Sequence, residues 1–351
     1  MLARMTSLFL IAFLAHPAVA ADAEELYAPG LGPHRVSMTD VSVINPATQR
    51  EIPVRVYCPE SEGTFPVIVF SHGAGDGNRT APALMHYWAS WGYVVVLPKH
   101  AASEVTGLRS RIERLEKEFD LINIDSAQAW NDRIGEAKAV IDAIEKPKSV
   151  FGAVATHMNS EKIGMSGHSL GARTTMLLAG TALFPDGAKK ALDFSDKRID
   201  AALLMSAIGT NGKTVTKDSW KNVTVPMMVM SGSRDSRTRK ETGEWRTESY
   251  QFAPNGDKYL VFLEGADHMT YIGPMRSDEP EDELPKSAPE KPSWFAREFP
   301  GMNEDVLFTY VRSASLAFWD AYLKDDAKAK AYLRGSALAT FSDGLATLEH
   351  K

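Results

Sequence analysis

The chain is predicted to be an α/β protein with a mostly parallel central sheet flanked by helices. Two short apolar runs, at residues 67–70 and 94–97, show no alternation of apolar and polar residues, which is typical of strands buried on both faces. Similar runs recur further along the chain, at residues 163–166, 201–205, 227–230 and 259–262. Segments with helical spacing of apolar residues lie between these runs. Such an alternation of strands and helices predicts a parallel sheet.

The remaining elements follow from local patterns. Residues 36–44 and 52–57 are joined through the turn sequence NPAT, and they predict an antiparallel pair of strands at the edge of the sheet. Helices are expected where apolar residues recur every three or four positions, at residues 83–91, 134–144, 172–179 and 316–323. The end of the chain, including His350, is expected to be disordered.

Composition excludes several classes of protein. Hydrophobic residues make up 44% of the 351 residues and charged residues 24%, which suits a globular core and not a fibre or a disordered chain. The net charge of −6, with no run of five basic residues, does not favour nucleic acid or an anionic membrane as a partner. Cys58 is the only cysteine, so an internal disulfide and a zinc site with two thiolates are excluded. Small molecules or other proteins are the expected partners.

The first twenty residues predict a signal peptide. Arg4 precedes an apolar run at residues 8–14, and the segment closes on the small residues AVA at 18–20. The apolar run is too short to span a membrane. We expect cleavage after Ala20, a secreted or periplasmic protein, and no stable membrane span in the mature chain.

Two segments interrupt the α/β pattern. Residues 104–120 are charged and predict a solvated helical insertion. Residues 276–292 contain four prolines and six acidic residues, and they predict a surface loop that helps to shape the mouth of the site. With these two segments treated as insertions, residues 21–351 are expected to form a single domain.

The sequence GHSLG at residues 167–171 marks the candidate nucleophile, Ser169. It lies directly after the expected strand at 163–166 and directly before the expected helix at 172–179. A nucleophile on such a tight turn needs strained backbone angles, and glycines two residues to either side relieve the crowding. The turn also places Ser169 at a helix N-terminus, where backbone N–H groups stabilise developing negative charge.

A serine nucleophile needs a base and an acid that orients the base. In enzymes with this turn the chain order is serine, acid, histidine, and only His268 and His350 follow Ser169. His268, after the last expected strand, is the candidate base, and activity should fall as it becomes protonated. Asp235, after the strand at 227–230, is the candidate acid. Two other aspartates fit less well, since Asp267 would point away from its neighbour His268 and Asp200 precedes its strand.

An oxyanion hole is expected from two backbone amides. The sequence SHGAG at 71–75 follows the strand at 67–70, in a position that supplies one donor. We assign the N–H groups of Ala74 and of Leu170, which follows the nucleophile. His72 and His168 each adjoin a glycine in a tight loop, so they are interpreted as residues that brace the loops and not as metal ligands.

At these residues the sequence resembles the α/β-hydrolases, and more narrowly the esterases similar to dienelactone hydrolase and to class II platelet-activating-factor acetylhydrolase. The resemblance rests on the motifs FPVIVFSHG, WGYVVV, GHSLG, GADH and AFWDAYL. It implies ester hydrolysis through an acyl-serine, without cofactor or metal. Two departures qualify it. The strand at 201–205 is followed by no acid, unlike that of the platelet-activating-factor enzymes, and a serine stands where dienelactone hydrolase has cysteine.

The sequence therefore predicts a secreted serine hydrolase that cleaves a small-molecule or lipid-like carboxylic ester. Three alternatives remain open. The same residues could transfer an acyl group to another acceptor or cleave peptides, and the fold could serve as a non-catalytic binding protein.

Overall fold

The computed structural model describes residues 25–101, 127–184, 190–236, 241–273 and 304–351. Three predicted features lie outside the described residues: the signal peptide at 1–20, the charged helical insertion at 104–120 and the proline-rich loop at 276–292. None of the helices within the described ranges is long and apolar enough to cross a membrane.

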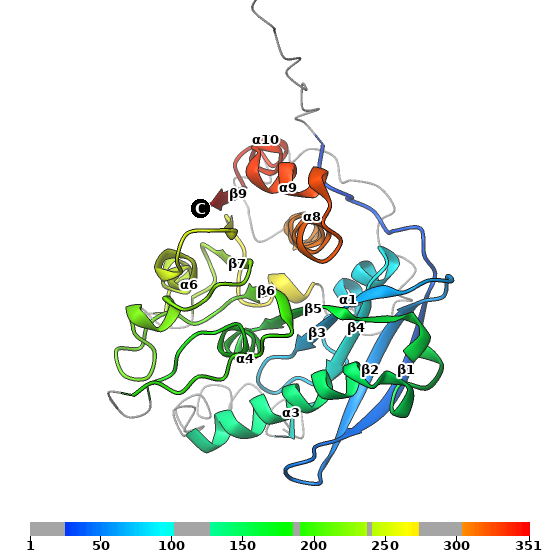
Figure 1. The fold of residues 1–351 in the computed structure, drawn as a ribbon. Helices are drawn as coiled ribbons and strands as arrows, with labels where there is room; N and C mark the ends of the chain where they lie inside the picture. The colour runs from blue at the N-terminus through cyan, green and yellow to red at the C-terminus, as the bar shows by residue number, and fades with distance from the viewer. Residues whose placement is uncertain (1–24, 102–126, 185–189, 237–240, 274–303) are drawn as a thin grey trace, which may run out of the picture.

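One mixed sheet runs through the described part of the chain (Figure 1). Its strands are, in chain order, β1 (Val36–Ile44), β2 (Glu51–Pro59), β3 (Phe65–Ser71), β4 (Val94–Pro98), β5 (Met158–His168), β6 (Ile199–Met205), β7 (Met227–Gly232), β8 (Lys258–Leu263) and β9 (Ala346–His350). The spatial order is β1-β2-β4-β3-β5-β6-β7-β8-β9. The six central strands, β3 to β8, are parallel to one another. At the two edges of the sheet, β1, β2 and β9 pair antiparallel with their neighbours.

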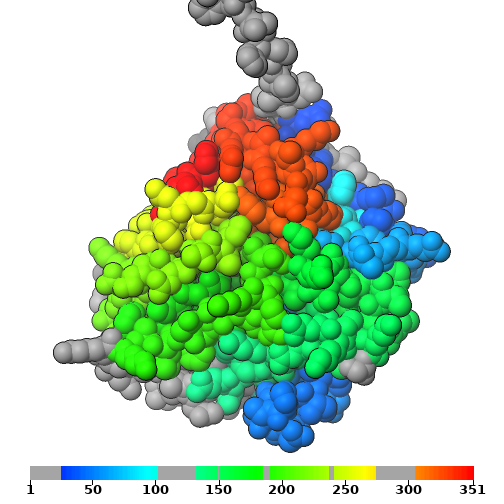
Figure 2. Space-filling view, in the orientation of Figure 1, coloured from blue at the N-terminus to red at the C-terminus, as the bar shows by residue number. Residues whose placement is uncertain are grey.

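Helices cover both faces of the sheet (Figure 1). One face packs against α1 (Pro82–Ser90), α8 (Glu304–Leu323), α9 (Ala327–Arg334) and α10 (Ala337–Phe341). The other packs against α3 (Ala127–Glu145), α4 (Leu170–Leu178) and α6 (Glu248–Phe252), and the short helix α5 (Gly243–Arg246) precedes α6. In the space-filling view the C-terminal helices, in orange and red, form one continuous part of the surface (Figure 2).

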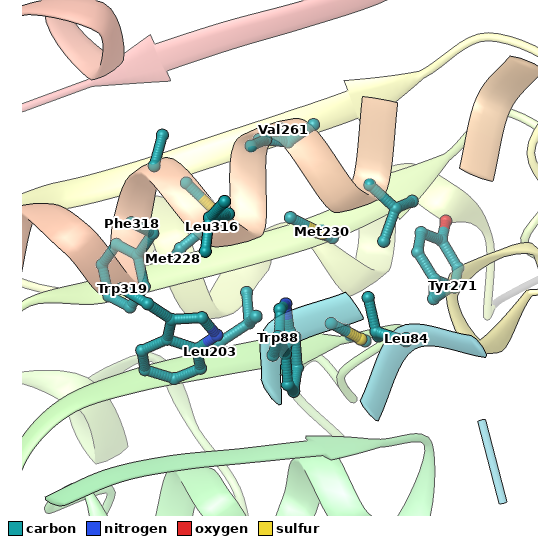
Figure 3. Close-up of a cluster of buried hydrophobic side chains, with 14 of the residues drawn as sticks. Leu84, Trp88, Leu203, Met228, Met230, Val261, Tyr271, Leu316, Phe318 and Trp319 are labelled. Atoms are coloured by element: carbon teal, nitrogen blue, oxygen red, sulfur yellow. The ribbon is translucent and has the colours of Figure 1, made fainter. Parts of the chain in front are cut away.

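The strand sequences explain the two layers. Successive side chains of a strand point to opposite faces, so in β3 Ile68 packs with α1 and α8 while Val69 packs with α3 and α4. On the α8 side, Trp88 of α1 meets Trp319 edge to face, with ring centroids 5.7 Å apart (Figure 3). Because both faces are covered, the inner strands carry the continuous apolar runs from which they were predicted.

The predicted class of fold is confirmed, and each strand predicted from the sequence is present. One expectation is wrong: the end of the chain is ordered, because residues up to His350 form β9 and pair with β8 in the register Tyr259↔His350. The strand buries only Ala346 fully, so its sequence carries little of the apolar signal by which strands are recognised.

Candidate active site

Ser169 lies on the sharp turn between β5 and α4. Its backbone has φ 55° and ψ −116°, a conformation that residues other than glycine rarely adopt. The Ser169 N–H donates to the Met205 carbonyl at the end of β6, at 3.0 Å, which ties the strained turn to the neighbouring strand. A strained residue held by its surroundings at the carboxyl edge of a parallel sheet is a candidate for function.

The two glycines of GHSLG are required by close packing. A Cβ at Gly171 would lie 1.7 Å from the Ser71 carbonyl oxygen, and a Cβ at Gly167 would lie 2.4 Å from the Gly171 carbonyl oxygen. Neither position has room for a side chain. The glycines thus allow the turn to approach the end of β3, next to the loop that follows it.

Three side chains from separate loops meet at the carboxyl edge of the sheet. His268 Nε2 lies 3.0 Å from Ser169 Oγ, and His268 Nδ1 lies 3.0 Å from Asp235 Oδ1. Asp235 follows β7 and His268 follows β8, so the sheet topology brings the two residues to Ser169. These distances permit a proton to pass from the serine hydroxyl to an imidazole that a carboxylate orients.

Asp235 is fully buried and is paired with a buried arginine. Arg246 Nε, from α5, lies 2.9 Å from Asp235 Oδ1, and Arg246 Nη1 donates to the Ser206 and Ala207 carbonyls. Burial alone would raise the pKa of Asp235. Hydrogen bonds from His268 and Ser206, together with the charge of Arg246, instead hold that pKa below its usual value. The Asp235 carboxylate is therefore ionised at the near-neutral pH at which His268 would act as a base.

Replacing Arg246 with methionine is expected to lower the free energy of unfolding by about 3–5 kcal/mol, since it leaves the buried Asp235 carboxylate without its cation. Urea unfolding at pH 7.5 measures the change. Arg35→Met is the matched control: it breaks an exposed pair with Glu60 and should cost no more than about 1 kcal/mol. Equal losses in the two variants would contradict the assigned role of Arg246.

The loop after β3 lies against the nucleophile. A Cβ built on Gly73 would be 3.6 Å from Ser169 Cβ. His72 Nδ1–H donates to the Gly73 carbonyl at 2.8 Å, and in a trans peptide that carbonyl points opposite to the Ala74 N–H. Leu170 is the first residue of α4, where N–H groups lack helical partners. Among the described residues, neither amide donates to a backbone carbonyl in a turn, loop or helix cap.

A buried polar network supports this loop from behind. The backbone N–H of His100 donates to His72 Nε2, and His100 Nδ1 lies 2.9 Å from Glu136 of α3. Arg133, also on α3, donates to the His72 carbonyl and to Ser71 Oγ. Burial, followed by the charge of Arg133, lowers the pKa of both histidines well below the usual value. Both rings are therefore neutral, and they serve as fixed hydrogen-bonding groups.

His168 braces the loop that carries the candidate base. Its Nε2 lies 2.6 Å from the His268 carbonyl oxygen, and burial together with the neighbouring His268 lowers the pKa of His168 to about 3. A carbonyl oxygen can only accept, so the neutral His168 ring donates this hydrogen bond from Nε2–H.

Among the residues that the structure describes, no cluster of His, Cys, Asp or Glu could hold a metal ion. Asp267 points into its own turn and accepts from the Met269 N–H, as expected.

Two residues of the site carry no sequence signal that would have identified them. Ser206 directly follows the apolar run of β6, and its hydroxyl contacts both Asp235 and His268. Arg246 belongs to the four-residue helix α5 and to no recognisable motif. Only the folded chain brings these two residues to the candidate triad of Ser169, His268 and Asp235.

The chlorophyllase family model matches residues 25–197, a range that includes Ser169 and the loop at 71–75 but ends before Asp235 and His268. The fold is that of an α/β-hydrolase. Chlorophyllase-1 of Arabidopsis thaliana is 39% identical over 57 residues, which is 16% of this chain and 18% of that protein.

The similarity to chlorophyllases supports an α/β-hydrolase that acts on esters. The match to Chlorophyllase-1 spans less than a fifth of that protein, so its activity is not transferred whole to this chain. The narrower resemblance to the dienelactone-hydrolase and platelet-activating-factor acetylhydrolase families stays a prediction.

Proposed function

We propose that the protein is a serine hydrolase that cleaves carboxylic esters through an acyl-serine intermediate. The observation that carries the proposal is the hydrogen-bonded series from Ser169 to His268 to Asp235, with Ser169 on a strained turn at the start of α4. The similarity to a family of esterases supports the same reaction class.

In this mechanism Ser169 Oγ attacks the ester carbonyl carbon while His268 Nε2 takes the hydroxyl proton. The carbonyl oxygen becomes an oxyanion that accepts hydrogen bonds from the Ala74 and Leu170 N–H groups. When the intermediate collapses, the bond to the alkoxy oxygen breaks and His268 returns the proton to the leaving alcohol. Water then gives a proton to His268 and attacks the acyl-serine, so the carboxylic acid leaves and Ser169 Oγ regains its proton.

For the substrate, we propose an ester with a large apolar group. Chlorophyllases, to which the first half of the chain is similar, act on chlorophyll as their name states. Met269, directly after the candidate base in the chain, has an apolar side chain that is 39% exposed. A hydrophobic alcohol or acyl group could cover this side chain.

A fluorophosphonate probe and a panel of esters test the proposal. We expect the probe to label the wild type and not Ser169→Ala, because a covalent adduct needs the activated hydroxyl. p-Nitrophenyl esters of increasing acyl length, chlorophyll a and peptide anilides are then compared, with methanol as a competing acceptor. Hydrolysis of esters but not anilides supports an esterase. Failure of the probe to label the wild type would contradict the proposed function, and methyl ester as the main product would favour acyl transfer.

A further inference from the structure

A third side chain contacts the base and the acid together. Ser206 Oγ lies 2.7 Å from His268 Nδ1 and 3.0 Å from Asp235 Oδ1, so the three atoms form a closed triangle. Ser206 follows β6, is fully buried and takes no part in the mechanism above. Ser206 thus contacts Nδ1 of His268, the ring nitrogen that does not face Ser169. A contact at this nitrogen can orient the His268 ring.

An ionised Asp235 favours one arrangement of protons in the triangle, because its Oδ1 lies 3.0 Å from His268 Nδ1 and would repel an unprotonated nitrogen there. Asp235 is ionised and can only accept, so the Ser206 hydroxyl donates its one proton to Asp235 Oδ1. The lone pairs of Ser206 Oγ are then free to accept from His268 Nδ1–H, which Ser206 Oγ shares with Asp235 Oδ1. A neutral imidazole with its proton on Nδ1 presents an unprotonated Nε2, and that nitrogen faces Ser169 Oγ at 3.0 Å. The hydroxyl therefore favours the tautomer that a general base requires.

The backbone holds Ser206 in place for this contact. Its φ is 53°, in the left-handed region that a serine keeps only when its surroundings enforce it. The Ser206 N–H donates to the Met230 carbonyl at 2.9 Å, and the Ser206 carbonyl accepts from Arg246. The preceding residue, Met205, accepts the N–H of Ser169. The end of β6 thus connects the nucleophile, the base and the acid.

We propose that Ser206 is a positioning residue that holds the His268 ring in the orientation and tautomer in which Nε2 accepts the proton of Ser169. The inference rests on the proposed function, because it assigns Ser206 a task only if Ser169 is the nucleophile. Ser206 does not touch the reacting atoms, so its removal should slow the chemical step and leave substrate binding unchanged.

Two substitutions at Ser206 separate the hydroxyl from the backbone strain. Ser206→Ala removes the hydroxyl and keeps the Cβ, whereas Ser206→Gly removes the hydroxyl and readily adopts a positive φ. We expect both to lower kcat about 10- to 100-fold with KM unchanged, the size of a lost hydrogen bond to a charged group. Ser166→Ala is the matched control, since it removes another buried serine hydroxyl, one that donates to the Leu203 carbonyl on β6. It should keep the wild-type kcat.

The pH profile gives a readout that a purely structural role would not move. An oxygen lone pair aimed at Nδ1–H stabilises the protonated ring, so the acid limb of kcat/KM should shift to lower pH in Ser206→Ala and stay in place in Ser166→Ala. A wild-type kcat and pH profile in Ser206→Ala would overturn the inference while the proposed function stands. If Ser206→Gly alone recovers the wild-type kcat, strain and not the hydroxyl is responsible, which also overturns it. A wild type that the fluorophosphonate probe does not label overturns both proposals.

Discussion

A His268→Ala variant is expected to hydrolyse p-nitrophenyl esters roughly 10⁴- to 10⁶-fold more slowly than the wild type, with little change in KM. Without the imidazole, the Ser169 hydroxyl has no group to take its proton, and Ser169 is a weak nucleophile at its own pKa. The residual rate would come from the oxyanion hole and from substrate binding. Steady-state kinetics and the rate of fluorophosphonate labelling measure the loss.

The matched control for this variant is His350→Gln. His350 is the one other histidine that follows Ser169 in the chain, but it is exposed on β9 and pairs with Tyr259. This variant should hydrolyse the esters at the wild-type rate. A His268→Ala variant within tenfold of the wild type would rule out His268 as the base.

Steep acid unfolding is the second large effect that we expect. Burial lowers the pKa of three histidines. The pKa of His72 and of His100 lies well below the usual value, and the pKa of His168 is lowered to about 3. In the unfolded chain each takes up a proton near pH 6.5, so the stability that their neutral forms provide is present above that pH and is lost as the pH falls. Glu136 acts in the opposite sense, because burial raises its pKa and favours the folded state at low pH. The net loss should be roughly 3–4 kcal/mol per pH unit below pH 6.

With such a slope, the free energy of unfolding of an ordinary domain falls to zero within a few pH units below pH 6. We therefore expect the protein to unfold cooperatively above about pH 4. Urea unfolding followed by tryptophan fluorescence at pH 7.5, 6.5, 5.5 and 4.5 measures the slope. His168→Gln should reduce the slope by about a third, whereas His350→Gln should leave it unchanged. A free energy of unfolding that is constant from pH 6.5 to pH 4.5 would mean that the buried histidines take up protons in the folded state.

Much of the fold was predictable because strands that are buried on both faces of the sheet have continuous apolar sequences. The continuous apolar runs of β3 to β8 identify these strands, and the order of the glycine-flanked Ser169, Asp235 and His268 places the three residues at one edge. The strand β9 has no such apolar sequence, since it lies at an edge and alternates only weakly. Its position depends on the free edge of β8, which local sequence does not describe.

The residues around the triad could not be predicted for a different reason. Ser206 reaches His268 because its backbone adopts φ 53°, and nothing in the sequence marks this residue for that conformation. Arg246 pairs with Asp235 only after α5 has folded against the end of β7. Both contacts join separate strands or helices, so they follow from packing and not from a motif.

The edge strand β9 has a consequence for the order in which the protein is assembled. The strand β8 leads into the loop of His268, and its outer edge is paired by residues 346–350. These residues are synthesised long after His268, so a nascent chain on the ribosome presents β8 with one edge unpaired. An unpaired strand edge is prone to join another chain. The loop of His268 therefore follows a strand whose outer edge stays unpaired until residues 346–350 have been synthesised.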